Sequence, residues 1–339
     1  MHRHRPILVI FLVLMGGCTP DTPATGDRTK DATSDANVAD VARDTAAAPD
    51  AMDARGDANR DVARRDATDS TEDTREDVEP PDTTLGNDQR PAEIVLPDAY
   101  DPTGSYPLVI ALHGYGMSGA SIDTYFELSE RVDERQFLLI SPDGMRDTTG
   151  QRFWNATDYC CDHYGAEPDD DAYVMGLIDE ATNQFAVDAE RIYLMGFSNG
   201  GFLAHRLACE HPDRIAGIVS LSGSSFDDAE ACSATDGGPR ILHVHGTADA
   251  VVGYYGTLAY PGARTVAERW ARRNGCQDDA TDRGRADFDL NVVGDETWQR
   301  EWEGCRDDSR VALWSLQGGL HVPTLRDAFV TSALDFLSN

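Results

Sequence analysis

Short apolar runs alternate with amphipathic, helix-length stretches throughout residues 91–339. Strands that are buried on both faces are apolar at almost every position, so the short runs predict strands. We expect strands over residues 93–96, 108–112, 137–140, 192–195, 215–221, 241–244 and 311–316. We expect helices over residues 121–135, 171–185, 200–211, 265–274 and 324–337.

This order of elements predicts an α/β fold. Parallel neighbours need crossover connections, and these are normally helical, so alternating strands and helices indicate a mainly parallel, doubly wound sheet with helices on both faces. In such sheets the reactive residues lie in the loops beyond the carboxyl ends of the strands. Candidate chemistry is therefore sought in those loops.

A G-x-S-x-G motif follows one of the predicted strands. Ser198 lies between Gly196 and Gly200, at the point where the strand over 192–195 gives way to a helical stretch. The glycines allow neighbouring backbone to pack closely against a sharp turn. This turn exposes the serine hydroxyl at the start of the helix. Ser198 is the candidate nucleophile, although a capping serine in a glycine-rich turn would give the same pattern.

A serine nucleophile needs a base, and the base needs an orienting carboxylate. Asp249 follows the strand over 241–244, and His321 lies in a glycine-rich loop after the strand over 311–316. The order Ser198, Asp249, His321 is the order expected of an α/β-hydrolase. His163 is an alternative base.

Two further histidines alternate on one strand. His243 and His245 share a face and could form a metal pair, although a strand-end histidine bonded to the backbone is more common. Asp249 could equally be a simple turn residue. We expect no metal and no cofactor.

Acyl transfer also needs donors for the developing oxyanion. The backbone N–H of Asn199, next to the nucleophile, is the first candidate. The second is the backbone N–H of Tyr115, in the His113-Gly114 segment that follows the strand over 108–112.

The first ninety residues have a different character. Arginines and histidines precede an apolar run over residues 7–15, too short to span a membrane, and small residues then precede Cys18. Residues 1–18 resemble a lipoprotein signal peptide, which makes Cys18 the expected lipid anchor; an ordinary secretory signal is the alternative. Residues 19–90 hold 19 acids and 9 bases and no Phe, Trp, Tyr or Ile. We expect a disordered acidic linker there, and a catalytic domain over 91–339.

The net charge of the chain limits the classes of molecule that it could bind. The chain has 29 Lys and Arg against 60 Asp and Glu, a formal net charge of -31. Such a chain is unsuited to neutralising phosphates, so we exclude nucleic acid. Residues 1–18 indicate an exported protein that contacts the membrane only through its lipid anchor.

Several segments together resemble a known family. They are residues 108–116, Ser141-Pro142-Asp143-Gly144, Trp154-Asn155-Ala156, Asp170-Asp171, residues 196–201 and residues 245–252. The chain resembles the esterases known as polyhydroxybutyrate depolymerases or feruloyl esterases. The resemblance implies a secreted serine esterase, with Ser198, Asp249 and His321 as its triad. It differs in Leu320 and Val322 around the histidine, where the family often has glycine and tryptophan.

Six cysteines accompany Cys18. In the resembled family the pair corresponding to Cys276–Cys305 is a disulfide. Cys209 and Cys232 flank the strand over 215–221, which suggests a second disulfide. Cys160 and Cys161 are either a vicinal disulfide or two thiols.

Aromatic residues in the expected loops are candidate substrate contacts, with core packing as the alternative; they are Trp154, Tyr159 and Tyr254. No additional polymer-binding module is visible, which favours a soluble or small ester. A serine peptidase on the same fold and a non-catalytic surface-binding protein remain the alternative functions.

Overall fold

The computed structural model describes residues 82–232, 238–307 and 309–338. The predicted signal peptide, Cys18 and most of the predicted linker lie outside these residues. Within them, no helix combines the length and the apolar character needed to cross a membrane.

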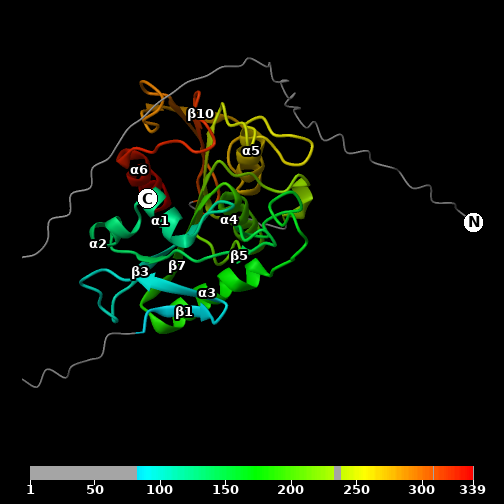
Figure 1. The fold of residues 1–339 in the computed structure, drawn as a ribbon. Helices are drawn as coiled ribbons and strands as arrows, with labels where there is room; N and C mark the ends of the chain where they lie inside the picture. Colours follow the sequence, from blue (N-terminus) through cyan, green and yellow to red (C-terminus); the bar gives the residue numbers. More distant parts are fainter. Residues whose placement is uncertain (1–81, 233–237, 308, 339) are drawn as a thin grey trace, which may run out of the picture. The chain divides into compact units, whose positions relative to one another are not determined.

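A ten-stranded sheet runs through the described residues (Figure 1). Its central strands are parallel, in the order β4–β3–β7–β8–β9–β12. These strands are β4 (Leu138–Ile140), β3 (Tyr106–Leu112), β7 (Val187–Phe197), β8 (Gly217–Leu221), β9 (Arg240–Gly246) and β12 (Val311–Leu316). The predicted mainly parallel sheet is confirmed.

Antiparallel strands extend both edges of the sheet. They are β1 (Thr84–Asn87) and β2 (Arg90–Val95) beside β4, and β11 (Thr297–Trp302) and β10 (Ala280–Ala286) beside β12. The short strands β5 (Met145–Arg146) and β6 (Arg152–Phe153) form a separate hairpin.

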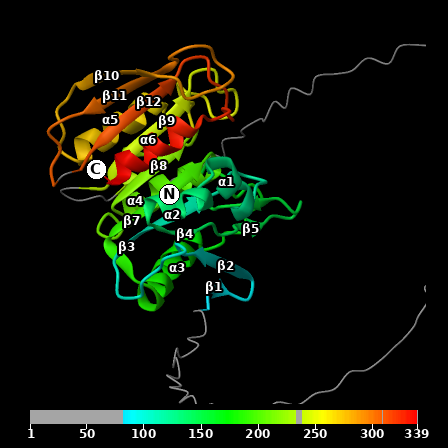
Figure 2. The same cartoon turned by 90° about the vertical axis from the view of Figure 1, so that its left-hand side faces the viewer.

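Helices cover the sheet on both faces (Figure 2). One face carries α3 (Asp170–Gln184), α4 (Asn199–Glu210) and α5 (Ala263–Arg273). The other carries α1 (Gly119–Phe126), the 3₁₀ turn η1 (Ser129–Arg131), α2 (Val132–Arg135) and α6 (Asp327–Ser338). A further 3₁₀ turn, η2 (Ala229–Ala231), precedes the 233–237 gap.

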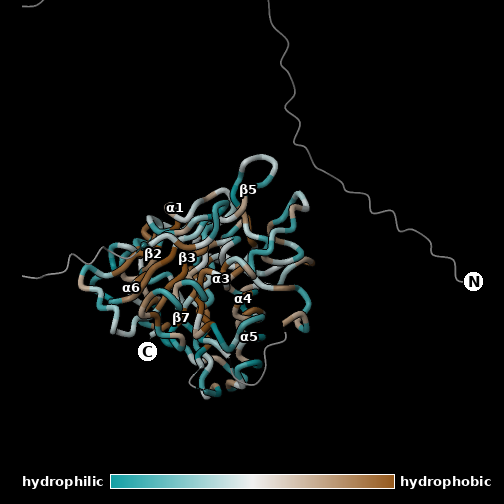
Figure 3. The backbone as a smooth tube through the Cα atoms, turned by 90° about the horizontal axis from the view of Figure 1, so that it is seen from below, coloured by the Kyte–Doolittle hydropathy of each residue, from teal (hydrophilic) through white to brown (hydrophobic). Residues whose placement is uncertain are grey.

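Alternate residues of β3 supply the two cores. Leu108 and Ile110 pack into the layer under α3, α4 and α5, whereas Val109 and Ala111 pack into the layer under α1 and α6. This follows from the two-residue period of a strand. Figure 3 shows the resulting apolar interior around β3 and β7.

The predicted linker ends too late. Thr84–Asn87 pairs with the next strand, and Leu85 is buried in the core, so the folded part begins before residue 90. The amide of Gly86 donates to Glu180 of α3 at 2.8 Å, which ties the hairpin down. One large apolar residue in a polar segment was too weak a signal to predict it.

The predicted helix over 121–135 is also interrupted. Glu127 adopts a left-handed conformation with φ 53° and ends α1. The Asp123 carboxylate accepts from the Ser129 amide at 2.8 Å, which stabilises the turn into η1. Continuous helical periodicity on both sides of Glu127 conceals this break.

Candidate active site

Ser198 occupies the sharp turn between β7 and α4. Its backbone has φ 52° and ψ -116°, a region that residues with a side chain rarely adopt. Its amide donates to the carbonyl of Leu221 at the end of β8, 2.8 Å away. The turn is thereby held against the neighbouring strand, and the side chain is only partly buried.

The flanking glycines are required by close backbone contacts. A Cβ on Gly196 would overlap the carbonyl oxygen of Gly200, and a Cβ on Gly200 would overlap that of Leu112. Both glycines therefore allow β7, α4 and β3 to approach one another at the turn.

Three loops bring the candidate triad together. The hydroxyl oxygen of Ser198 lies 3.0 Å from His321 Nε2. His321 Nδ1 lies 2.8 Å from Asp249 Oδ2. Since a carboxylate only accepts, His321 donates from Nδ1, and the bare Nε2 of the neutral ring accepts from the serine. The other proposed base, His163, packs against Tyr115 instead.

Asp249 is held by four donors. Its Oδ1 accepts from the amides of Val251 and Val252 at 2.8 and 2.9 Å. Its Oδ2 faces both His321 and His245 Nε2, the latter at 3.2 Å. Burial alone would raise the pKa of Asp249, but hydrogen bonds from the two histidines hold the pKa of this carboxyl well below its usual range.

His245 was not predicted at this site. Its Nε2 also lies 2.7 Å from the carbonyl oxygen of Val252, so it is bonded to the backbone as well as to Asp249. The signal in the sequence was its position four residues before Asp249, at the end of the strand. His243 and His245, the two residues of the possible metal pair, contact each other through His243 Nε2 and His245 Nδ1. The metal-pair hypothesis does not predict this contact.

The candidate oxyanion donors lie at the ends of two adjacent strands. Asn199 is the first residue of α4, so its amide has no partner within the helix. Tyr115 lies in the loop after β3, and its hydroxyl donates to Asp147. The side chain of Asn199 accepts from the Trp154 amide at 2.7 Å and donates to the Trp154 carbonyl at 2.9 Å.

His113 and Trp154 support the same loop. The indole N–H of Trp154 donates to the His113 carbonyl at 3.0 Å, and His113 Nε2 accepts from the Gly144 amide at 2.9 Å. Burial lowers the pKa of His113 to about 4, which keeps the ring neutral. Neither role was predicted from the sequence, because both depend on side chain to backbone contacts across loops.

The predicted substrate contacts do not share one environment. Trp154 is fully buried, so the expectation that it contacts substrate is wrong: it packs beneath the site. Tyr159 is 45% exposed and packs on Tyr260, with ring centroids 4.7 Å apart. Tyr254 is partly buried, and its hydroxyl is hydrogen-bonded to Ser315 at 2.7 Å.

Apolar side chains surround the candidate base. Leu320 and Val322, on either side of His321, are both more than half exposed, as is Val251 beside Asp249. Apolar surface next to the reacting groups is suited to an apolar acyl or alcohol portion of a substrate.

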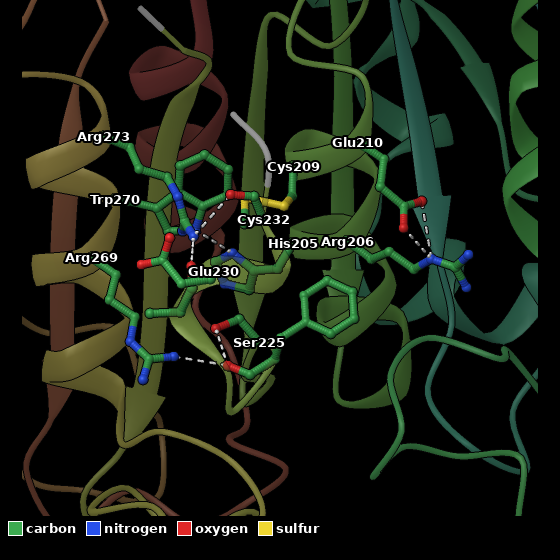
Figure 4. Close-up of a disulfide and its surroundings, with 12 residues drawn as sticks. His205, Arg206, Cys209, Glu210, Ser225, Glu230, Cys232, Arg269, Trp270 and Arg273 are labelled. Atoms are coloured by element: carbon green, nitrogen blue, oxygen red, sulfur yellow. Dashed lines mark hydrogen bonds and ion pairs between the residues drawn. A yellow bond between two sulfur atoms is a disulfide. The ribbon is translucent and has the colours of Figure 1, made fainter. Parts of the chain in front are cut away.

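Six cysteines are paired as three disulfides in the structure: Cys160–Cys161, Cys209–Cys232 and Cys276–Cys305. The second joins α4 to the segment after β8 (Figure 4). Cys160 lies next to the nucleophile turn, where its sulfur is 3.4 Å from Asn199 Nδ2.

A surface cluster of possible metal ligands lies elsewhere in the described residues. Asp171, Glu210 and His211 place ligand atoms within 4.8 Å of one another. Their side chains are paired within the chain, because His211 bonds Asp171 at 2.6 Å and Glu210 pairs with Arg206. This cluster is separate from the candidate triad.

Comparison with known proteins gives a consistent result. A family model described as Phospholipase/Carboxylesterase matches residues 102–266, which include Ser198 and Asp249 and end before His321. Feruloyl esterase B from Piromyces equi is 27% identical over 244 residues, which cover 67% of this chain and 42% of that protein. The chain thus spans less than half of that relative's length.

A solved structure completes the comparison. Acetyl xylan esterase from Aspergillus awamori matches with a TM-score of 0.55 at 13% identity, covering 75% of this chain and 98% of that protein. The chain has the α/β-hydrolase fold and is similar in sequence to esterases. Feruloyl esterase D from Neurospora crassa is 23% identical to this α/β-hydrolase over 257 residues, which cover 72% of this chain and 78% of the relative. The family resemblance stated from the sequence motifs is confirmed.

Proposed function

We propose that this α/β-hydrolase is a serine carboxylic-ester hydrolase that acts through Ser198, His321 and Asp249. The observation that carries the proposal is the hydrogen-bonded series from the Ser198 hydroxyl through the His321 ring to the Asp249 carboxylate. This is the arrangement that converts a serine hydroxyl into a nucleophile at neutral pH.

The proposed reaction has two halves. Ser198 Oγ attacks the ester carbonyl carbon while His321 Nε2 takes the hydroxyl proton. The ester C–O bond then breaks, and His321 returns the proton to the leaving alcohol, which leaves an acyl-enzyme. In the second half His321 Nε2 removes a proton from water while the water oxygen attacks the acyl carbon. The bond between that carbon and Ser198 Oγ then breaks, His321 returns the proton to Oγ, and the acid is released.

The oxyanion is assigned to two backbone amides. The N–H groups of Asn199 and Tyr115 lie at the ends of adjacent strands. The Asn199 side chain binds the backbone of Trp154, whose indole binds the His113 carbonyl in the loop that holds Tyr115. Donors fixed in this way need no rearrangement when negative charge develops.

The proposed substrate is a soluble or polymer-linked ester of an aromatic or short-chain acid. Exposed Leu320, Val322 and Tyr159 favour an apolar portion, and several relatives, among them those from Piromyces equi and Neurospora crassa, bear the name feruloyl esterase. The net charge of -31 disfavours strongly anionic esters.

Activity measurements on the purified protein test this proposal. We expect hydrolysis of p-nitrophenyl acetate and methyl ferulate, and a loss in kcat of roughly 10,000-fold or more in Ser198→Ala. Ser129→Ala, which changes an exposed serine in η1, is the matched control and should keep full activity. Cleavage of a peptide amide in preference to the esters would indicate a peptidase. A wild type as inert as Ser198→Ala would indicate a binding protein.

We further propose that the protein is exported and anchored by lipid at Cys18, with the acidic linker as a spacer. Expressed in a bacterial host, the full chain should partition into detergent, and Cys18→Ser should move it to the aqueous phase. A control substitution of Thr19, the next residue, by Ser should not. Equal partitioning of Cys18→Ser and wild type would contradict the anchor.

A further inference from the structure

A series of buried rings leads from α5 to the candidate triad. Trp270 Nε1 lies 3.0 Å from His205 Nδ1, and His205 Nε2 lies 3.1 Å from His243 Nδ1. His243 Nε2 in turn lies 3.4 Å from His245 Nδ1, whose other nitrogen reaches Asp249. All four rings are at most 2% exposed.

The tryptophan sets the direction of the series. An indole N–H can only donate, so His205 Nδ1 accepts and a neutral His205 carries its proton on Nε2. That proton points to Nδ1 of His243, which likewise carries its own proton on Nε2. Figure 4 shows His205 and Trp270 facing each other beside the Cys209–Cys232 disulfide.

The opposite end gives the same direction independently. The carbonyl oxygen of Val252 can only accept, and it lies 2.7 Å from His245 Nε2. His245 therefore carries a proton on Nε2, and its Nδ1 is free to accept from His243. The same nitrogen lies 3.2 Å from Asp249 Oδ2, so its one N–H is shared between the Val252 carbonyl and the carboxylate.

The rings in the middle are neutral. Burial lowers the pKa of His205 to about 3, with the charge of Arg273 as a smaller cause. Burial also places the pKa of His243 well below 6.5, and its two histidine neighbours lower it further. Each hydrogen bond of the series then contains one proton. An additional proton would make two N–H groups face each other in one of these bonds.

We propose that His245 is a positioning residue for ester hydrolysis, which orients the Asp249 carboxylate through an Nε2–H that the Trp270–His205–His243 series fixes. The inference rests on the proposed function. Oδ1 is fixed by the amides of Val251 and Val252, and His245 is the second side-chain donor to Oδ2 beside His321. A carboxylate fixed at both oxygens keeps the His321 ring aimed at Ser198.

Kinetics of two His245 variants test the proposal. Glutamine can place an N–H donor near the position of Nε2, whereas leucine cannot. His245→Leu should lower kcat for p-nitrophenyl acetate roughly 10- to 100-fold with KM within about twofold, because one donor to a charged acceptor is lost. His245→Gln should recover most of kcat. His211→Leu, which removes a histidine outside the site, should leave kcat unchanged.

A double-mutant cycle separates positioning from a merely structural role. If His245 acts through Asp249, adding His245→Leu to Asp249→Asn should lower kcat by less than about twofold further. A full additional loss, or equal impairment of the leucine and glutamine variants, would overturn the proposal. An inert wild type would instead refute the esterase proposal itself.

Nuclear magnetic resonance determines which ring nitrogens of the series carry a proton, and it requires neither an activity measurement nor a substitution. In protein with ¹⁵N-labelled histidine, His205, His243 and His245 should each have a bare Nδ1 and a protonated Nε2. A proton on Nδ1 of His245 would overturn the proposal even if the leucine variant failed to fold.

Discussion

Ser198 combines an unfavourable backbone conformation with the position that the chemistry needs. A positive φ at a residue with a side chain costs on the order of 1 kcal/mol or more, and it persists here because β3, β7 and α4 pack closely around the turn. The close packing depends on Gly196 and Gly200, since neither position has room for a Cβ.

Alanine at Gly200 tests this packing. Because the new Cβ would overlap the Leu112 carbonyl, Gly200→Ala should lower the free energy of unfolding by about 1–3 kcal/mol and kcat/KM by about 100-fold. Urea unfolding and ester kinetics measure the two effects. Gly176, in the middle of α3, has nothing within 4 Å of a Cβ, so Gly176→Ala should stabilise by about 0.5–1 kcal/mol. Wild-type kinetics in Gly200→Ala would show that the turn tolerates displacement.

Residue chemistry was more predictable than residue environment. Ser198, Asp249 and His321 could be nominated together because parallel strands bring their carboxyl ends to one edge of the sheet. Trp154 shows the limit of that reasoning. A loop position does not reveal whether a side chain faces solvent or the core, and here the indole is buried on the His113 carbonyl.

At the scale of elements, periodicity predicted the buried strands and the long helices well. The strand over 311–316 coincides with β12, and the helix over 171–185 matches α3 to within a residue. The elements that were missed are those whose sequence is polar. Strand β10, Ala-Thr-Asp-Arg-Gly-Arg-Ala, is exposed along most of its length. It pairs with β11 through backbone hydrogen bonds, so its sequence contains no apolar pattern that would predict a strand.

At the scale of the molecule, the part of the chain that the structure describes has two apolar layers, and burial strongly lowers the pKa of three of its histidines. His113, His205 and His243 remain neutral when folded, with the pKa at about 4 for His113 and about 3 for His205. An unfolded histidine takes up a proton near pH 6.5. Unfolding therefore binds protons below that pH, and folding stability must decrease as the pH falls.

The expected pH dependence is steep. Below pH 6.5 each of the three histidines should remove up to about 1.4 kcal/mol of stability per pH unit, or about 4 kcal/mol per unit together, down to about pH 4. Urea unfolding at pH 7.5, 6, 5 and 4.5 measures the slope. Replacing the exposed His163 by Gln should leave it unchanged. A free energy of unfolding that stays constant from pH 7 to 5 would show that these rings are already accessible to protons.

The outer strand β10 also bears on how molecules of this protein meet. Its pairing with β11 shifts register between Asp282 and Gly284; Arg283 there is ion-paired with Glu301 and Glu303, and Arg285 lies over the Trp298 ring. An edge strand that is irregular and carries charged side chains is a poor template for a strand from another molecule, so it disfavours edge-to-edge pairing between molecules. At this edge of the sheet, the backbone groups that β11 leaves unpaired are therefore less available to a second molecule.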